Sequence, residues 1–160
     1  MNKLILLQQL RSAIMERISA FQRSAQNAHA EATDEQNKAE SKYDTRALEA
    51  SYLAEGQTRQ AAEAEQAFLQ LETFEPRAFG VDDPVDIGAL LELEAGDRVC
   101  DWYFLAPCAG GTEVEFEGRK VLVLTAQSPL GAQLIGVRRG GKVGIKVGAG
   151  RSNFRVKSLF

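Results

Sequence analysis

No glycine and no proline precedes Gly56, and this restricts what the first half of the chain can form. Apolar residues recur there every three or four positions, which is the spacing of one face of an α-helix. A second series with the same spacing follows. The two series are Leu7, Leu10, Ile14, Ile18, Phe21, Ala25 and Ala28, and then Ala47, Ala50, Ala54, Gln57, Ala61, Ala64, Phe68 and Leu71. The pattern predicts two long helices, the first from near Asn2 to near Ala32.

Both series have large residues at the outer ends of residues 1–75 and alanines toward the middle. An antiparallel pair would therefore match Leu7 and Leu10 with Phe68 and Leu71. Alanine seams let helices approach closely, but each alanine buries far less apolar surface than a leucine. A single continuous rod is the alternative, and it would need a partner chain to cover its stripe. We favour an antiparallel coiled-coil hairpin over residues 1–75, with its tip near residues 33–44.

The segment between the two series is polar and rich in carboxylates, reading ATDEQNKAESKYD. Thr33 or Asp34 can cap the start of a second helix. The acidic residues are Asp34, Glu35, Glu40 and Asp44. Mg²⁺ prefers oxygen ligands and usually keeps some waters, so exposed carboxylates can complete a cation site that another macromolecule provides. The alternative is a solvated loop whose charges only serve solubility.

The apolar period changes from helical to two residues beyond a linker at residues 76–84, which contains Pro76, Gly80 and Pro84. Alternating segments predict half-buried antiparallel strands. These segments include Leu91–Leu93, Val114–Phe116, Val143–Val147 and Phe154–Val156, while 99–105 and 120–124 alternate less and are expected to be central. Residues 85–160 are thus expected to form a small antiparallel sheet.

One short helix is predicted between these strands. Ser128 suits a helix cap, Pro129 suits the first helical position, and Gly136 suits the left-handed residue that ends a helix. The expected fold class is α+β, with a helical hairpin followed by a sheet and one short helix.

Charge is distributed unevenly along a chain of net charge −3. No acidic residue follows Glu117, whereas nine basic residues do: Arg119, Lys120, Arg138, Arg139, Lys142, Lys146, Arg151, Arg155 and Lys157. A basic face suits an acidic partner or a nucleic-acid backbone. The alternative is that these are ordinary solvated residues of strands.

The residues do not predict an enzyme. His29 is the one histidine, and no Ser-His-Asp set or Cys-His pair is present. Cys100 and Cys108 fit neither a zinc nor a redox spacing, so we expect small core residues. The amino-terminal apolar run is broken by Gln8, Gln9 and Arg11 and is too short for a membrane span. A cytoplasmic protein without a membrane contact is expected.

The segment SPLGAQLIG, followed by a strand pair and a last strand ending at Phe160, resembles the Gre family of bacterial transcript cleavage factors (GreA/GreB-like). The resemblance implies an FKBP-like fold for residues 85–160. It implies docking of that domain at the secondary channel of bacterial RNA polymerase, with the coiled coil entering the channel. The docking residues it implies are Ser128, Pro129, Leu130, Leu134, Ile135 and Gly136.

In this family two tip acids in a D-x-x-E arrangement help hold the polymerase's second Mg²⁺, which hydrolyses backtracked RNA. Aligning Glu55 and Gly56 with the family's E-G puts Glu40 at the glutamate position and Asn37 at the aspartate position. An amide adds no charge to the metal site, so Asp34 or Glu35 would have to substitute. The resemblance thus implies Mg²⁺ shared with the polymerase through Glu40 and Asp34, and no cofactor bound by this chain alone.

The expected function is regulation of transcription elongation by a monomer that meets the 3′ end of backtracked RNA only indirectly. Two alternatives stay open. One is a regulator that occupies the secondary channel without stimulating cleavage. The other is a protein-interaction module unrelated to polymerase, in which the helical arm dimerises.

Overall fold

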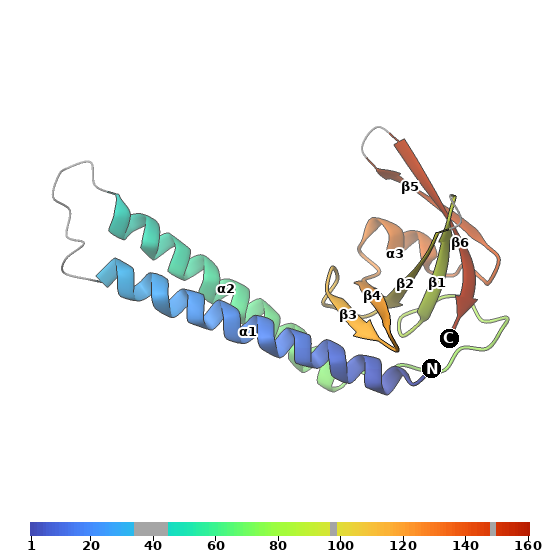
Figure 1. The fold of residues 1–160 in the computed structure, drawn as a ribbon, viewed down its shortest axis with the longest axis horizontal. Coiled ribbons are helices and arrows are strands. Elements are labelled where there is room, and N and C mark those ends of the chain that lie inside the picture. Colours follow the sequence, from blue (N-terminus) through green and yellow to red (C-terminus); the bar gives the residue numbers. More distant parts are fainter. Residues whose placement is uncertain (34–44, 97–98, 148–149) are drawn as a thin grey trace. The chain divides into compact units, whose positions relative to one another are not determined.

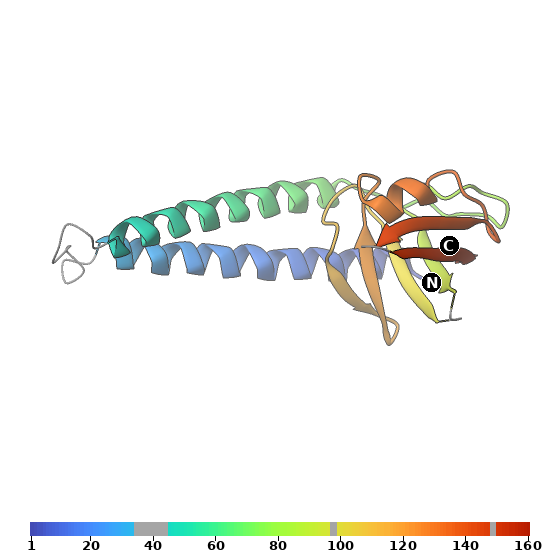
Figure 2. The same cartoon turned by 90° about the horizontal axis from the view of Figure 1, so that it is seen from above.

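The computed structural model describes residues 1–33, 45–96, 99–147 and 150–160. Helices α1 (Lys3–Thr33) and α2 (Arg46–Glu72) lie side by side and antiparallel (Figures 1 and 2). Gln22 Nε2 on α1 donates a hydrogen bond of 3.0 Å to Glu65 Oε1 on α2. The predicted hairpin is therefore confirmed. At a rise of about 1.5 Å per residue, α1 is about 45 Å long.

The two predicted apolar stripes form the contact seam of this hairpin. Alanines Ala28, Ala50, Ala61 and Ala64 are buried along it, and His29 is exposed beside it, as expected. Most of the large residues of the two series are buried, and they lie toward the start of α1 and the end of α2: Leu7, Leu10, Ile14, Ile18 and Leu71. Phe68 is partly buried. Because a leucine buries far more apolar surface than an alanine, most of the hairpin's hydrophobic stabilisation lies at this end.

The chain divides into two compact units, and each of the helices α1 and α2 contributes residues to both units. One unit is Ile14–Leu69, the outer part of the hairpin. The other combines Met1–Ala13 with Gln70–Phe160, so the start of α1 and the end of α2 belong with the sheet.

Arg11 connects α1 to the carboxyl end of α2. Its guanidinium donates hydrogen bonds to the carbonyl oxygens of Leu71 and Glu72, each at 3.1 Å for one nitrogen. The last turn of α2 has no basic residue of its own. A cation at this position satisfies carbonyls that have no partner within the helix and interacts favourably with the helix dipole. Arg11 therefore acts as the carboxyl-terminal cap of α2.

Lys3 connects α1 to the sheet and to the end of the chain. Its ammonium donates to the carbonyl oxygens of Gly88 at 2.9 Å, of Phe160 at 3.0 Å, and of Arg77. The same ammonium lies 4.7 Å from the ring centre of Phe79. Burial, together with the nearby Arg77 guanidinium, lowers the pKa of Lys3 from 10.5 to about 8. One side chain thus joins three segments that are distant in sequence.

The strands of the sheet unit are β1 (Leu90–Ala95), β2 (Cys100–Leu105), β3 (Glu113–Phe116), β4 (Arg119–Leu124), β5 (Lys142–Val147) and β6 (Gly150–Leu159). Within the described ranges they form one sheet in the order β3-β4-β2-β1-β6-β5. Segments 99–105 and 120–124 were expected to be central, and the strands they contain, β2 and β4, are interior in this order. Helix α3 (Pro129–Leu134) follows β4.

The expectation of an antiparallel sheet needs one correction. Strands β2 and β4 pair in parallel, with Trp102 opposite Val121, whereas the other recorded pairs are antiparallel. The chain leaves β2, makes β3 and returns through β4, and β4 then pairs on the side of β2 away from β1. Alternation of apolar residues reports which face of a strand is buried but not the direction of its neighbour, so the sheet is mixed.

Both faces of the sheet carry buried apolar side chains. On the first face, α3 contributes Leu130 and Leu134 to a core with the following strand residues: Leu91, Leu93, Tyr103, Leu105, Leu124, Val143 and Val156. On the second face Leu90, Phe104, Val121 and Val123 are fully buried. The start of α1 belongs to this unit too, and its Leu6, Leu7 and Leu10 are buried.

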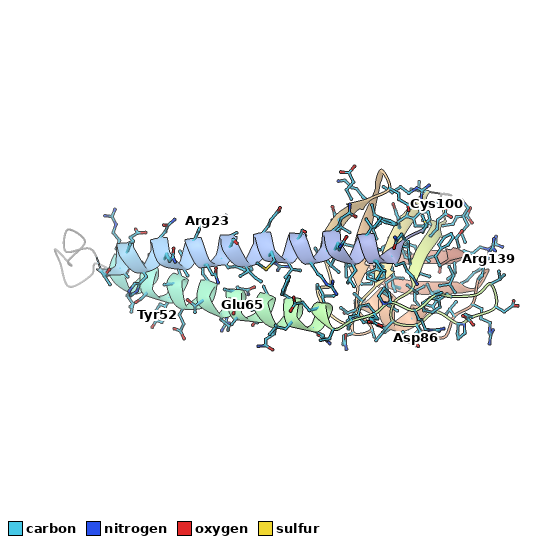
Figure 3. All side chains as sticks on the ribbon, turned by 90° about the horizontal axis from the view of Figure 1, so that it is seen from below. Arg23, Tyr52, Glu65, Asp86, Cys100 and Arg139 are labelled. Atoms are coloured by element: carbon cyan, nitrogen blue, oxygen red, sulfur yellow. The ribbon has the colours of Figure 1, made fainter. Side chains whose placement is uncertain are left out.

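We predict that Arg11→Gln lowers the free energy of unfolding by about 1–2 kcal/mol, because it removes charge-assisted hydrogen bonds to the end of α2. Urea unfolding followed by circular dichroism measures this. Arg23→Gln is the matched control, since Arg23 is an exposed residue of α1 (Figure 3) and should change stability by less than about 0.5 kcal/mol. Equal losses in both variants would contradict the capping role of Arg11.

Candidate functional site

The tip carboxylates predicted from sequence lie outside the described residues. This holds for Asp34, Glu35, Glu40 and Asp44, and also for Asn37. The structure does describe the residues that border the segment: α1 ends at Thr33 and α2 begins at Arg46.

The helix cap expected at Thr33 is wrong. Thr33 is the last residue of α1, and its hydroxyl donates a hydrogen bond of 2.9 Å to the carbonyl of His29 in the preceding turn. Thr45 stands at the start of α2 instead, and its carbonyl accepts from the amide of Glu49 at 2.9 Å. The Thr45 hydroxyl also hydrogen-bonds to the Glu49 carboxylate at 2.9 Å. Threonine is a preferred residue at helix starts, but Thr45 was not considered in the sequence analysis.

The predicted short helix is present with the expected boundaries. The Ser128 hydroxyl accepts from the amide of Gly131 at 3.1 Å and donates to the carbonyl of Thr125 at 2.8 Å. Pro129 opens α3. Gly136 has a φ of 80°, which a residue with a side chain adopts only with strain. These features hold the SPLGAQLIG segment in one conformation.

The six residues that the resemblance implies for docking divide between the interior and the surface. Leu130 and Leu134 are buried in the core beneath α3, so they support the helix rather than offer a contact. Pro129 and Gly136 are exposed, and Ile135 is 40% exposed despite its apolar side chain. A partner binding here would meet Pro129, Ile135 and Gly136.

The segment beside the end of α3 is fixed to it by the main chain. The amide of Gly136 donates to the carbonyl of Val85, and the amide of Val85 donates to the carbonyl of Val137, both at 2.8 Å. The Arg138 guanidinium donates to the carbonyl of Asp82. Residues 82–85 and 135–138 therefore form one continuous surface, and sequence reasoning had treated residues 76–84 only as a linker.

The basic residues after Glu117 serve different purposes. Lys120 lies 3.9 Å from the Glu113 carboxylate in an exposed ion pair. Arg119 stacks its guanidinium over the Trp102 ring at 4.8 Å, and Trp102 in turn stacks with Phe160. Lys120 and Arg119 therefore fit the expectation that the basic residues are ordinary surface residues of strands.

Glu92 is the centre of a charged cluster on the sheet. Its carboxylate accepts from Lys157 Nζ at 2.8 Å and from the Ser158 hydroxyl at 2.9 Å. Lys157 Nζ also lies 3.5 Å from Cys100 Sγ. The hydrogen bond from Lys157 is the main reason that the pKa of Glu92 is lowered, and the same bond raises the pKa of Lys157.

Burial makes the Cys108 thiol a poor candidate for catalysis, whereas Cys100 lies beside the Lys157 ammonium. Cys100 and Cys108 are partly buried and not joined to each other, and burial raises the pKa of the Cys108 thiol. A raised pKa disfavours the reactive thiolate. In the part of the chain that is described, no three His, Cys, Asp or Glu side chains gather in a way that could hold a metal ion. Among the described helices, none is long and apolar enough to cross a membrane.

Comparison with solved structures finds proteins of similar architecture. GreA factor homolog 1 of Thermus thermophilus is 19% identical, with a TM-score of 0.38 over 94% of each chain. The homologous protein of Thermus aquaticus is 20% identical, with a TM-score of 0.39 over 91% of this chain and 90% of the other. The GreA/GreB elongation factor of Nitrosomonas europaea is 18% identical, with a TM-score of 0.38 over 74% of this chain and 94% of the other. No family model and no curated protein sequence matches the chain.

We predict that Gly131→Ala destabilises the protein by more than about 2 kcal/mol. A Cβ at this position would lie 2.0 Å from the Thr125 carbonyl oxygen, so the start of α3 must shift. Thermal unfolding measures the loss, and Gly56→Ala is the control because a Cβ at Gly56 meets no atom within 4 Å. Gly56→Ala should stabilise α2 slightly, since alanine is the better helix former. Tolerance of Gly131→Ala would contradict the tight turn described here.

We also predict a pH-dependent contribution from Glu92. Its folded pKa is lower than its unfolded pKa, so its contribution to stability is present above about pH 4.5 and is lost as the pH falls through the folded pKa. The stability difference between the wild type and Glu92→Gln should shrink between pH 6 and about pH 3. Urea midpoints across this range measure it. A difference that stays constant with pH would contradict the Glu92–Lys157 interaction.

Proposed function

We propose that this protein is a regulator of transcription elongation that binds bacterial RNA polymerase. In this proposal the sheet unit docks at the rim of the polymerase's secondary channel, and the hairpin enters the channel. The proposal rests on one observation above all. The chain forms a long two-helix hairpin, and the start of α1 and the end of α2 belong to the small sheet unit. Such a hairpin can carry a polar segment into a narrow space that a globular domain could not enter.

The segment SPLGAQLIG supports a docking role for the sheet unit. Its backbone is fixed by the Ser128 cap and by the buried side chains of Leu130 and Leu134. Pro129 and Ile135 are thereby presented as a preformed apolar surface, and a surface that is ordered before binding loses less conformational entropy on association. Substituting these two exposed residues should weaken polymerase binding without unfolding the protein.

For the tip we propose that Glu40, with Asp34 or Glu35, adds oxygen ligands to the Mg²⁺ that the polymerase holds. The chemistry is hydrolysis of backtracked RNA by the polymerase, so this protein stimulates a reaction and is not itself the enzyme. Carboxylates suit this role because Mg²⁺ binds oxygen ligands and carries two positive charges.

A regulator that occupies the channel without stimulating cleavage is the second candidate. It is favoured by Asn37, which stands where the Gre pattern has an aspartate. An amide oxygen can coordinate a cation but contributes no negative charge, so one carboxylate fewer lowers the affinity for the metal. The two candidates share the same binding mode and differ in whether RNA is shortened.

We predict that the wild-type protein accelerates Mg²⁺-dependent shortening of RNA in a backtracked elongation complex. Glu40→Gln should slow this at least about tenfold, because it removes a charged ligand of the metal, and Asp34→Asn should slow it less. Gel electrophoresis of end-labelled RNA measures the rates. Glu63→Gln is the control, because Glu63 is an exposed carboxylate of α2 within the unit Ile14–Leu69 and far in sequence from residues 34–44.

The outcomes separate the candidates. Equal rates for the wild type and all three variants would remove the assignment of Glu40 and Asp34 to the metal. Binding without any shortening would establish the channel-occupying regulator. Absence of binding to polymerase would overturn the proposal and favour an unrelated protein-interaction module, which a stable dimer in sedimentation would support.

A further inference from the structure

Among the described residues, the charged side chains on the outer face of the β5–β6 hairpin are all basic. Its inner face packs Val143, Val156 and their apolar neighbours into the core beneath α3. The outward-facing charged side chains that the structure describes on these two strands are Lys142, Lys146, Arg155 and Lys157. Alternation explains why outward residues are polar, but it does not explain why these four all carry a positive charge. We call these four residues the basic ribbon.

Two adjoining hollows lie on this face, and both are lined by Arg155 and Glu94. Arg139, which lines the second hollow, is labelled in Figure 3. The first has a volume of about 310 Å³ and the second about 400 Å³. Lys142 and Asn153 line the first, and Arg139, Gly140 and Lys157 line the second. Each hollow therefore has basic side chains of its own in addition to Arg155.

The basic side chains of the two hollows are held in different ways. Arg139 Nε donates to the carbonyl of Lys157 at 3.1 Å, which fixes its guanidinium through one nitrogen. Lys157 is paired with Glu92 at 2.8 Å. Arg155 and Lys142 make no ion pair with any described residue, although Glu94 is the strand neighbour of Arg155. The positive charge of Arg155 and Lys142 is therefore available to a ligand.

From this arrangement we infer that the basic ribbon, with Arg139, binds the phosphate groups of a single RNA strand. Arg155 contacts two successive phosphates, Lys142 completes the first hollow, and Arg139 completes the second. Lys142 and Arg155 are register partners on neighbouring strands, which lie about 4.8 Å apart. This spacing suits a chain of compact anions, and guanidinium groups match phosphate oxygens with paired hydrogen bonds.

An acidic protein segment is the competing partner for a basic face. Two separate, small hollows that share one arginine fit discrete phosphate groups better than carboxylates on flexible side chains. Single-strand binding proteins likewise use a positively charged groove that follows the backbone, together with aromatic side chains on which bases stack. The ribbon does not include any of the docking residues Ser128–Gly136 or the tip, so this inference is independent of the proposed function.

Glu94 allows a second test, in which the expected change in RNA affinity has the opposite sign. Its carboxylate lines both hollows and would repel a phosphate in either of them. Removing that charge should strengthen RNA binding, whereas removing Arg155 should weaken it. A site for a divalent cation would respond in the reverse direction.

The test uses the full-length protein and a fluorescently labelled RNA strand of mixed sequence, with binding followed by anisotropy across a range of salt concentrations. Each phosphate that a basic side chain neutralises contributes about 0.7 to the slope of log K against log salt for a single strand, and Arg155, with one positive charge, counts once although it lies between two phosphates. Arg155→Gln should reduce the slope by about 0.7 and weaken binding about fivefold or more at 0.1 M salt. The double change Arg155→Gln with Lys142→Gln should reduce the slope by about 1.4.

Lys120→Gln is the matched control, because it removes one exposed positive charge from β4, which lies on the other side of β2 and β1 from β5 and β6. It should leave the slope and affinity nearly unchanged, and Glu94→Gln should tighten binding about twofold or more. Equal effects of Arg155→Gln and Lys120→Gln, or no RNA binding by the wild type, would overturn the inference. Displacement of RNA by polyglutamate at the same charge concentration would overturn it in favour of an acidic protein. Unchanged thermal unfolding of Arg155→Gln confirms that its effect is local.

Discussion

The structure depends on the contacts that join the start of α1 and the end of α2 to each other and to the sheet. An alanine seam brings two helices close together but buries little apolar surface, so the outer hairpin gains modest stabilisation for its length. The large apolar residues are concentrated instead at the start of α1 and the end of α2, where Leu7, Leu10 and Leu71 are buried. Arg11 and Lys3 add polar contacts at this same end, each to main-chain carbonyls. The start of α1 and the end of α2 are thereby fixed within the sheet unit.

This uneven distribution of stability suits the proposed role. A hairpin that is firmly packed where α1 begins and α2 ends, and more weakly packed farther out, can let its outer part adjust to a narrow channel. Residues 128–136, which we propose for docking, differ from the outer hairpin in being rigid. The Ser128 cap, the tight packing at Gly131 and two buried leucines fix their conformation. The same chain therefore combines a fixed contact surface with an adaptable arm.

Much of the fold could be predicted because its determinants are local. The three-and-four spacing of the two apolar series identifies α1 and α2, and Ser128, Pro129 and Gly136 mark the boundaries of α3 within one residue. The parallel pairing of β2 with β4 could not be predicted, since side-chain alternation is the same for either strand direction. The roles of Lys3 and Arg11 were also hidden, because their acceptors lie 60 or more positions away in sequence.

The candidate site, like the fold, could be predicted from the sequence only in part. The sequence correctly predicted a short helix within residues 128–136, but only the packing separates Leu130 and Leu134, which are buried, from Pro129 and Ile135, which are exposed. The nine basic residues looked alike in sequence, and their neighbours now distinguish them: Lys120 pairs with Glu113, Arg119 stacks on Trp102, and Arg155 stays without an ion pair among the described residues. Charge runs identify candidates, and contacts decide which of them can take a ligand.

The most direct test of the account is hydrogen–deuterium exchange of this protein alone and in complex with bacterial RNA polymerase. Binding by the proposed mode predicts slower amide exchange in residues 14–69 and in residues 128–136 when the polymerase is present. The strands of the core should exchange slowly in both states. Protection confined to other parts of the sheet unit, with the hairpin and residues 128–136 exchanging as they do in the free protein, would contradict it.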